Sequence, residues 1–316
     1  MADLDVEPEV GRRPPLIIDR GQVRPAAEWS ELPRRQTVYA RLHTFVGAFR
    51  DFGVSIPAAI LLFVTSACFI GPALFHVQGP NAGLIQDSLI PFGSAKHFFG
   101  TDNIGNDMVS RILFGGRISL EVGLATTTIG VSIGTLIGML AGYVGGILDV
   151  LVMRALDVML AFPGIILALA IVTWLGASEV NVIFALSFFA IPYYARLSRG
   201  QTLSTKHRDY VTAARISGAG VARVIRQHVF RNVLPTLLTV SMLTIGTVML
   251  AEAGLSYLGL GIRPPEPSWG NLITTGQSYM TTRPGLLLEP AACIFLTVLN
   301  LNLLGDGLRR RFALAR

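Results

Sequence analysis

Residues 118–143 read ISLEVGLATTTIGVSIGTLIGMLAGY, and they identify the class of protein. Glu121 is the only charged residue among these 26. An α-helix needs ~20 predominantly apolar residues to cross the hydrocarbon core of a bilayer, so this stretch predicts a transmembrane helix. The rest of the chain shows whether there are further transmembrane helices.

Similar stretches recur along the chain, and the composition agrees with them. Hydrophobic residues make up 51% of the 316 residues and charged residues 15%, whereas an ordinary soluble domain has about 25% charged residues. Soluble globular and disordered classes are therefore excluded. The predicted spans cover residues 54–75, 118–143, 151–175, 181–197, 235–258 and 290–308. Pro163 interrupts the third of these spans, and Pro192 lies in the short fourth. We expect an all-α membrane protein with six transmembrane helices.

The distribution of Lys and Arg predicts the orientation. With the N-terminus in the cytoplasm, 21 of the 26 Lys and Arg residues lie in inside segments and 5 in outside segments. Cytoplasmic loops carry this excess in membrane proteins, so we expect both termini inside. Eight of the 21 lie in residues 195–235, which we call the basic loop, against a single acidic residue, Asp209. The net charge of +6 is thus concentrated at the membrane and does not indicate nucleic-acid binding.

The chain before the first span falls into two parts. Residues 1–35 are proline-rich and charge-balanced, so we expect a disordered cytoplasmic tail. In residues 36–53, apolar side chains recur at helical spacing, which predicts an amphipathic helix lying on the membrane surface. The alternative is a cytoplasmic extension of the first span. Residues 54–116 then form the first span with an extracytoplasmic segment, and residues 117–316 form the core.

Several kinds of active site are excluded. The two lysines, Lys96 and Lys206, are both followed by His. A Walker A loop requires Gly-Lys-Ser/Thr, so the chain does not hydrolyse nucleotides through a P-loop. The one GxSxG sequence, GVSIG at residues 130–134, lies inside the predicted second span, and there is no HExxH sequence, no CxxC among the two cysteines, and no metal-ligand spacing. We expect no catalytic residues, no metal and no cofactor in this chain.

Four glycines form a ridge along the second span. Gly130, Gly134, Gly138 and Gly142 recur every fourth residue, which lets a neighbouring helix approach closely. The ridge predicts either tight packing within this subunit or a face that meets a second membrane subunit. The spacing does not separate these alternatives.

Three carboxylates lie in or near the spans: Glu121, Asp157 and Glu252. Ionisable residues in membrane segments are costly and indicate function. All three lie near span ends, where we expect water or headgroups to reach them. Asp157 also follows Arg154 by three residues, so a local ion pair is available. Asp157 and Glu252 are therefore candidates for structural or gating roles along the transport path, in preference to a proton relay.

The basic loop contains two predicted helices separated by glycines. Asp209 is the predicted N-cap of the first helix, which Gly218 and Gly220 can end in the left-handed conformation. The second helix has an apolar face, and Pro235 opens the fifth span. This ordered face favours docking to another protein over a solvated loop. Residues predicted at the docking site are Asp209, Tyr210, Thr212, Ala213, Ala214, Arg215, Gly218, Arg223 and Arg226.

Residues 209–235 resemble the EAA loop of binding-protein-dependent ABC importer permeases. Residues 100–111, GTDNIGNDMVSR, and residues 255–261, LSYLGLG, are similar to motifs of the dipeptide and oligopeptide permease C branch. So are the segments GYVGG from residue 142, MRALD from residue 153 and PPEPSWG from residue 264. The resemblance covers residues 54–316. It implies the type I importer architecture and a coupling helix that inserts into an ATPase subunit.

The chain departs from the family pattern at a few positions. Thr212 replaces the Glu of the motif, which removes a capping box with Asp209. Phe230 and Arg231 replace a Leu-Pro pair, and Asn106 stands where the family usually has Arg. Asp102 and Asp107 lie in the same motif as Asn106. We expect a turn here that starts a helix, and the alternative interpretation is a cation site formed by the two carboxylates.

The resemblance predicts a transmembrane subunit that forms half of a peptide translocation path. Its implied partners are a similar permease subunit, ATPase subunits that bind ATP and Mg, an extracytoplasmic substrate-binding protein and membrane lipid. The alternatives are an ion-coupled secondary carrier, which needs carboxylates at midspan, and a membrane-embedded enzyme. The sequence does not distinguish dipeptides, longer peptides, nickel complexes or other small solutes as cargo.

Overall fold

The computed structural model describes residues 16–19, 22–25 and 52–314. The chain divides into two units, residues 1–47 and residues 48–316, which are described separately. In the first unit, β1 (Leu16–Asp19) pairs antiparallel with β2 (Gln22–Pro25). This hairpin lies within the segment expected to be disordered. The predicted amphipathic helix over residues 36–53 lies outside the described residues, apart from its last two, which begin α2.

The second unit is helical throughout its regular structure. It begins with α2 (Phe52–Phe69), α3 (Gly71–Leu74), η2 (Ile85–Asp87), α4 (Met108–Ile129), η3 (Gly130–Gly134), α5 (Thr135–Val144), α6 (Gly146–Leu160) and α7 (Gly164–Leu175). It continues with α8 (Glu179–Thr205), α9 (Asp209–Ile216), α10 (Val221–Val224), η4 (Ile225–Val229), α11 (Phe230–Tyr257), α12 (Trp269–Gln277) and α13 (Gly285–Leu314). The elements η3 and η4 are single π-helical turns, which continue the helices on either side.

Five helical segments of the described residues are long and apolar enough to cross a membrane. They are α2, the run from α4 to α5, α8, the run from α10 to α11, and α13. The bent pair α6–α7 is the sixth when it counts as one span, and its two helices meet at 79°. Pro163 is the N-cap of α7, so the predicted interruption of the third span is confirmed.

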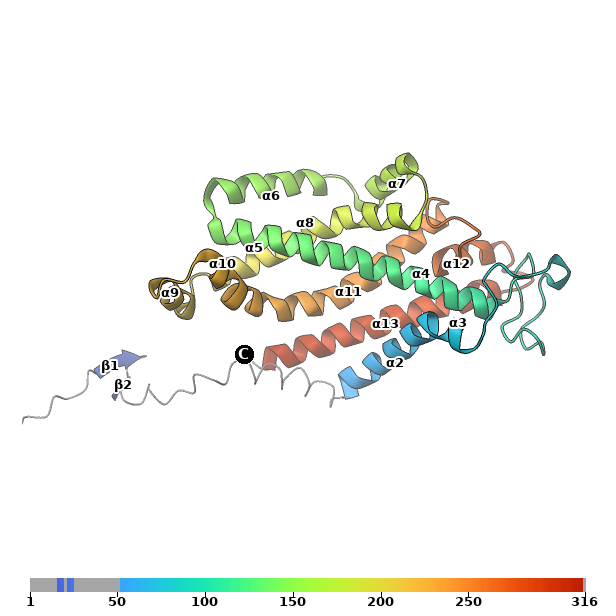
Figure 1. Cartoon of the computed structure of the whole chain (residues 1–316), viewed down its shortest axis with the longest axis horizontal. Coiled ribbons are helices and arrows are strands. Elements are labelled where there is room, and N and C mark those ends of the chain that lie inside the picture. Colours follow the sequence, from blue (N-terminus) through green and yellow to red (C-terminus); the bar gives the residue numbers. More distant parts are fainter. Residues whose placement is uncertain (1–15, 20–21, 26–51, 315–316) are drawn as a thin grey trace, which may run out of the picture. The chain divides into compact units, whose positions relative to one another are not determined.

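The helices run lengthwise and alternate in direction (Figure 1). The basic loop with α9 and α10 lies at one end, and α13 ends on the side of the bundle nearer to it. We call this the loop end. Helices α3 and α12 and the segment between α3 and α4 lie at the other end, which we call the opposite end.

Helix α11 lies at the centre of the packing. Met249 contributes to a core with α2, α4, α12 and α13, and Val248 contributes to a second core with α4, α7 and α8. Near the loop end, Val233 and Leu237 contribute to a third core with α5 and α8. Because one helix takes part in all three cores, its position constrains every other long helix.

Three predicted span limits are wrong, and the first of them is the start of the second span, which was expected at residue 118 although the helical run begins at Met108. The fourth span was expected to end at residue 197, but α8 continues to Thr205 and Pro192 lies inside it. The extra turns carry Arg199, whose charge is paired with Asp149 of α6. The fifth span was expected to begin at Pro235, but the helix is continuous from Val221. Transmembrane helices tolerate proline where neighbours and local π turns accommodate it, and η4 is such a turn.

Candidate functional site

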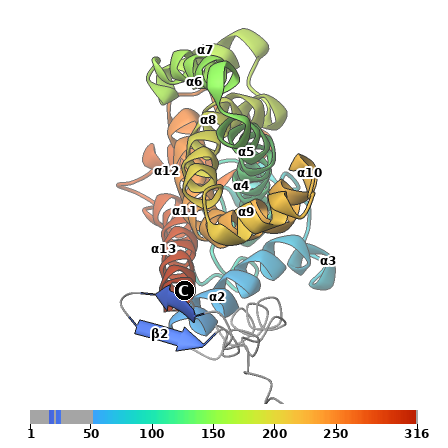
Figure 2. The same cartoon turned by 90° about the vertical axis from the view of Figure 1, so that its left-hand side faces the viewer.

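The basic loop folds into two short helices separated by a glycine turn, with α9 and α10 side by side (Figure 2). Gly218 has a φ of +82° and follows the end of α9. The Ala219 amide donates to the Ala214 carbonyl over 3.0 Å, and the Gly218 amide donates to Arg215 over 3.0 Å. This pattern closes a helix around a left-handed residue, as predicted for Gly218. Gly220 is extended, with a φ of −66°, so its predicted left-handed conformation is wrong.

The start of α9 differs from the prediction by one residue. Arg208 is the N-cap and makes no side-chain capping bond, whereas Asp209 is the first helical residue. The Arg208 carbonyl accepts from the Val211 amide over 2.9 Å and from the Thr212 amide over 3.1 Å, so the helical bonding begins there. Asp209 still places a carboxylate in the first turn, where it interacts favourably with the helix dipole.

Side-chain contacts hold α9 against its neighbours. Val211 is fully buried. The Tyr210 and His228 rings lie 6.0 Å apart. The Asn232 amide nitrogen donates to the Thr205 hydroxyl over 3.0 Å and to the Tyr210 hydroxyl over 3.5 Å. These contacts connect α9 to the end of α8 and the start of α11, so the two loop helices form one unit with the long helices.

Most of the other side chains of the loop helices face away from the protein, whereas Val224 of α10 is buried. Ile216 is 83% exposed, and Val221, expected on the apolar face, is 52% exposed. Of the residues predicted at the docking site, only Ala214 is half-buried. The exposed ones are Asp209, Tyr210, Thr212, Ala213, Arg215, Gly218, Arg223 and Arg226. The loop therefore offers a surface with exposed apolar and basic side chains on a braced backbone, which suits a protein partner.

The glycine ridge packs against α8 of the same chain. A Cβ on Gly138 would collide with the Ala195 carbonyl, and one on Gly134 with the Ile191 carbonyl. Gly130 and Gly142 face Ala190 and Arg199 in the same way. Of the two alternatives left open above, the structure places this ridge in a contact within the subunit.

Two of the three carboxylates form exposed ion pairs. Asp157 lies 2.6 Å from Arg196 and 3.9 Å from Arg154, so the predicted local pair is present but a residue of α8 lies closer. Glu121 pairs with Arg117 over 2.9 Å, one turn away on α4.

Glu252 differs from the prediction, because it is fully buried. Its carboxylate accepts hydrogen bonds from the hydroxyls of Ser256 and Ser268, each over 2.8 Å, and of Ser119 over 3.3 Å. The expectation that water or headgroups reach it is wrong because α12 packs over this part of α11. The predicted limits of a span do not show that another helix, here α12, packs over its end.

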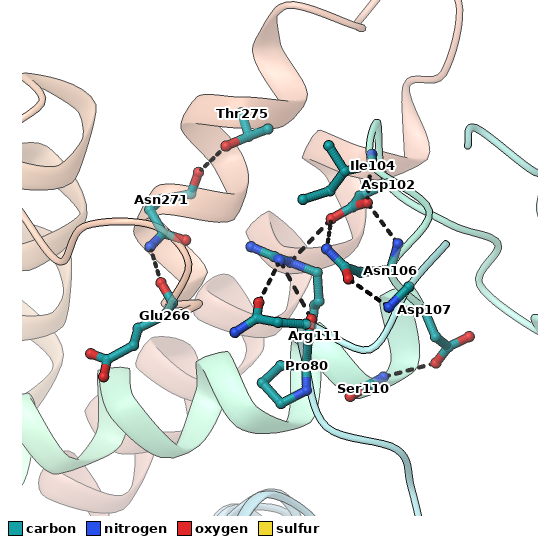
Figure 3. A network of polar contacts seen from close by, with 12 residues as sticks. Pro80, Asp102, Ile104, Asn106, Asp107, Ser110, Arg111, Glu266, Asn271 and Thr275 are labelled. Carbon is teal, nitrogen blue, oxygen red and sulfur yellow. Dashed lines mark hydrogen bonds and ion pairs between the residues drawn. The ribbon is translucent and has the colours of Figure 1, made fainter. Parts of the chain in front are cut away.

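The motif at residues 100–111 forms a polar network at the opposite end (Figure 3). Asp102 accepts from the Ile104 amide and from the amide and side chain of Asn106, each over 2.9 Å. Arg111 lies 3.4 Å from the same carboxylate. The predicted turn is present, but Asp107 caps α4 by accepting from the Ser110 amide over 2.9 Å. Among the described residues, no group of three or more His, Cys, Asp or Glu is arranged to hold a metal.

Residues 134–314 match the model of a family described as the binding-protein-dependent transport system inner membrane component. The chain is 44% identical over 267 residues to the glutathione transport system permease protein GsiD of Escherichia coli O6:K15:H31 (strain 536 / UPEC), and equally to that of Shigella sonnei (strain Ss046). Each alignment covers 84% of this chain and 88% of the relative.

This chain belongs to that family of inner membrane components. It is therefore a transmembrane subunit of an ABC importer and a multi-pass protein of the inner membrane. Membership implies ATPase and substrate-binding partners in general. The alternative of an ion-coupled secondary carrier gains no support from these relatives.

Solved structures with the same fold include two crystal forms of the MetNI methionine ABC transporter in inward-facing conformations. One matches with a TM-score of 0.54 and 21% identity, covering 66% of this chain and 98% of the other. The second matches with a TM-score of 0.53 and 20% identity, covering 65% and 97%. The permease therefore has the type I importer fold.

The sequence did not predict the contacts that attach α6 and α5 to the end of α8 in this permease. Asp149 binds Arg199 through two hydrogen bonds of 2.5 and 2.7 Å. The Lys206 ammonium donates to the Gly142 carbonyl over 2.9 Å. The signal was available in part, since Asp149 is an isolated charge in an apolar run, but its partner lies 50 residues away.

Proposed function

We propose that this permease forms half of the translocation path of a peptide importer and pairs with a second, similar permease subunit. An ATPase subunit would dock on the basic loop, and an extracytoplasmic binding protein would deliver the peptide. ATP and Mg would bind to the ATPase subunits, while this chain would carry no cofactor and catalyse no reaction. The described residues contribute helices and a docking surface, which fits this division of labour.

The continuous helix from the basic loop through α11 carries the coupling part of the proposal. It comprises the 37 residues Val221–Tyr257 and contributes buried residues to three of the hydrophobic cores. A displacement of the loop by an ATPase would therefore move the centre of the bundle and not a peripheral helix. The competing interpretation is a solvated loop. That interpretation does not explain why the loop is continuous with the central helix.

The relatives named above transport glutathione, a tripeptide, and this supports peptides as the cargo class. A cavity of about 490 Å³ lies between α6, α7, α8 and α11. Its walls are mainly apolar, with the hydroxyls of Thr244 and Thr247 among the lining residues. We propose that this cavity forms part of the wall of the translocation path. Walls with few polar groups bind a peptide only weakly, which allows it to pass. Asp157, which pairs with Arg196 of α8, remains a candidate on α6, whereas Glu252 is covered by α12.

Purification from the native membrane and reconstitution test the proposal. The tagged chain should retain an ATPase subunit and a second permease, and liposomes that contain the complex should take up labelled glutathione or a dipeptide. Uptake should require ATP and an added binding protein. Uptake by the chain without an ATPase, driven by an ion gradient, would establish the carrier alternative. Matched liposomes without ATP serve as the control.

A further inference from the structure

Glu252 lies where three helices meet, and each of them contributes a serine to its carboxylate. Ser256 lies one turn further along α11, Ser268 is the N-cap of α12, and Ser119 belongs to α4. The first two donate to Oε1 and Ser119 donates to Oε2. The Glu252 side chain has no exposed surface. Three hydroxyl donors and the N-terminus of α12 therefore stabilise its carboxylate in place of water.

The same serines hold the first turn of α12. A hydroxyl has one proton to donate, so a serine that donates to Glu252 has only lone pairs left for other groups. The Ser119 oxygen accepts from the Trp269 amide over 3.1 Å, and the Ser268 oxygen accepts from the Asn271 amide over 3.1 Å. Glu252 therefore sets the direction of two hydroxyls that bind backbone amides of α12.

Close packing leaves α12 little freedom to move by itself. A Cβ on Gly270 would lie 2.7 Å from the Cα of Ala253 on α11. A Cβ on Gly276 would lie 2.5 Å from the Leu286 carbonyl carbon on α13. The Trp269 indole also donates to the Ile112 carbonyl of α4 over 2.8 Å. At the glycine positions, α12 contacts its neighbours backbone to backbone.

We propose that Glu252 is a positioning residue that fixes α12 to α11 and α4, so that α12 moves with α11 as one body. Helix α11 is continuous with the basic loop, so movement of the loop would reach the opposite end of the permease through this carboxylate. The coupling role rests on the proposed function above, whereas the fixation of α12 does not. A proton-carrying role for Glu252 is the competing interpretation.

Two substitutions of Glu252 separate these interpretations. Glu252→Gln keeps an oxygen that can accept from Ser256 and Ser268, and it loses only the ability to titrate and to accept from Ser119. Glu252→Leu has a similar volume and removes all three acceptors. If Glu252 is a positioning residue, Glu252→Gln should retain most of the uptake activity and Glu252→Leu should lose it. Proton transfer predicts that both variants are inactive.

The experiment measures amide hydrogen exchange and uptake in the complete complex in nanodiscs and liposomes. In Glu252→Leu, exchange at Trp269 and Asn271 should rise about tenfold, since two buried hydroxyls lose their acceptor. Uptake per ATP hydrolysed should fall by a similar factor, while the ATPase subunit is retained. Exchange over residues 209–229 should stay unchanged. Glu121→Leu, which removes a half-buried carboxylate from α4, is the matched control and should leave α12 exchange unchanged.

Unchanged exchange at Trp269 and Asn271 would overturn the proposal, as would faster exchange along all of α11 or complete loss of uptake in Glu252→Gln. If Glu252→Leu fails to insert, Ser119→Ala decides, because it removes a single hydroxyl and should still accelerate exchange at Trp269. A wild-type complex that takes up no peptide would refute the proposed function. The exchange data would nevertheless test Glu252, because they do not depend on the cargo.

Discussion

The polar network of residues 100–111 and the loop helices α9 and α10, at opposite ends of this permease, use their charged residues in opposite ways. At the opposite end, Asp102 and Arg111 are 5% and 7% exposed and bind each other, and the buried Arg283 donates to the Phe99 carbonyl over 3.0 Å. At the loop end, Asp209 and Arg215 are exposed on α9. A buried charge is costly unless it is paired, so the first set fixes a shape. An exposed charge costs little to keep and stays available to a partner.

The comparison predicts the largest effect for Asp102→Ala. The substitution leaves Arg111 buried without its carboxylate and removes the acceptor for two backbone amides, which costs about 3–5 kcal/mol of stability. The amount of intact subunit in the membrane should fall, and residues 79–107 should become sensitive to protease. Glu266→Ala is the control, since Glu266 is an exposed acidic residue at the same end. Equal yields and cleavage rates for the two variants would contradict the assignment of Asp102.

An intermediate effect is expected for Gly218→Val at the loop end. A β-carbon at positive φ costs about 1–2 kcal/mol, and the space around Gly218 is open, so the strain is in the backbone alone. Insertion and folding of the long helices should persist, while retention of the ATPase subunit should fall about fivefold or more.

Gly220→Val is a close control for this variant. Gly220 also has open space around its Cβ position, but its φ is negative, so valine adopts the same backbone there without that strain. Equal ATPase retention and stimulation in the two variants would remove the coupling assignment from the Gly218 turn.

A smaller effect is expected when basic residues are removed from the exposed surface. Arg223→Ala combined with Arg226→Ala should change the stability of the subunit by less than about 0.5 kcal/mol, because both side chains are exposed. Association with the ATPase should slow, and the difference from wild type should shrink at high salt. Arg154→Ala, 80% exposed on α6, provides the control. A loss of subunit stability instead would show that these arginines belong to the fold.

The smallest effect is expected for deletion of residues 2–35. This segment is charge-balanced and proline-rich, with no apolar periodicity for docking. The deletion variant should assemble with its partners and transport at the wild-type rate in the same liposome assay. Normal assembly with lost uptake would identify a contact that the sequence does not reveal.

Local features of the sequence were sufficient for much of this description. Apolar length predicted the spans, Pro163 predicted the break between α6 and α7, and Gly218 predicted the left-handed turn after α9. Each of these depends on interactions within a few residues of chain. The error at Asp209 is also local, because the N-cap is one residue earlier, at Arg208, which makes no side-chain capping bond.

The pairing of distant residues was decided by the tertiary structure. The glycine ridge of residues 130–142 permits close approach by any helix, and only the bundle shows that α8 fills it. Asp149 is hydrogen-bonded to Arg199 of α8, and the Glu252 carboxylate accepts hydrogen bonds from hydroxyls of α4 and α12. Hydrophobicity and periodicity describe which side of a helix avoids water, but a buried polar group is stabilised by a specific partner. That partner is fixed only once the helices lie beside one another.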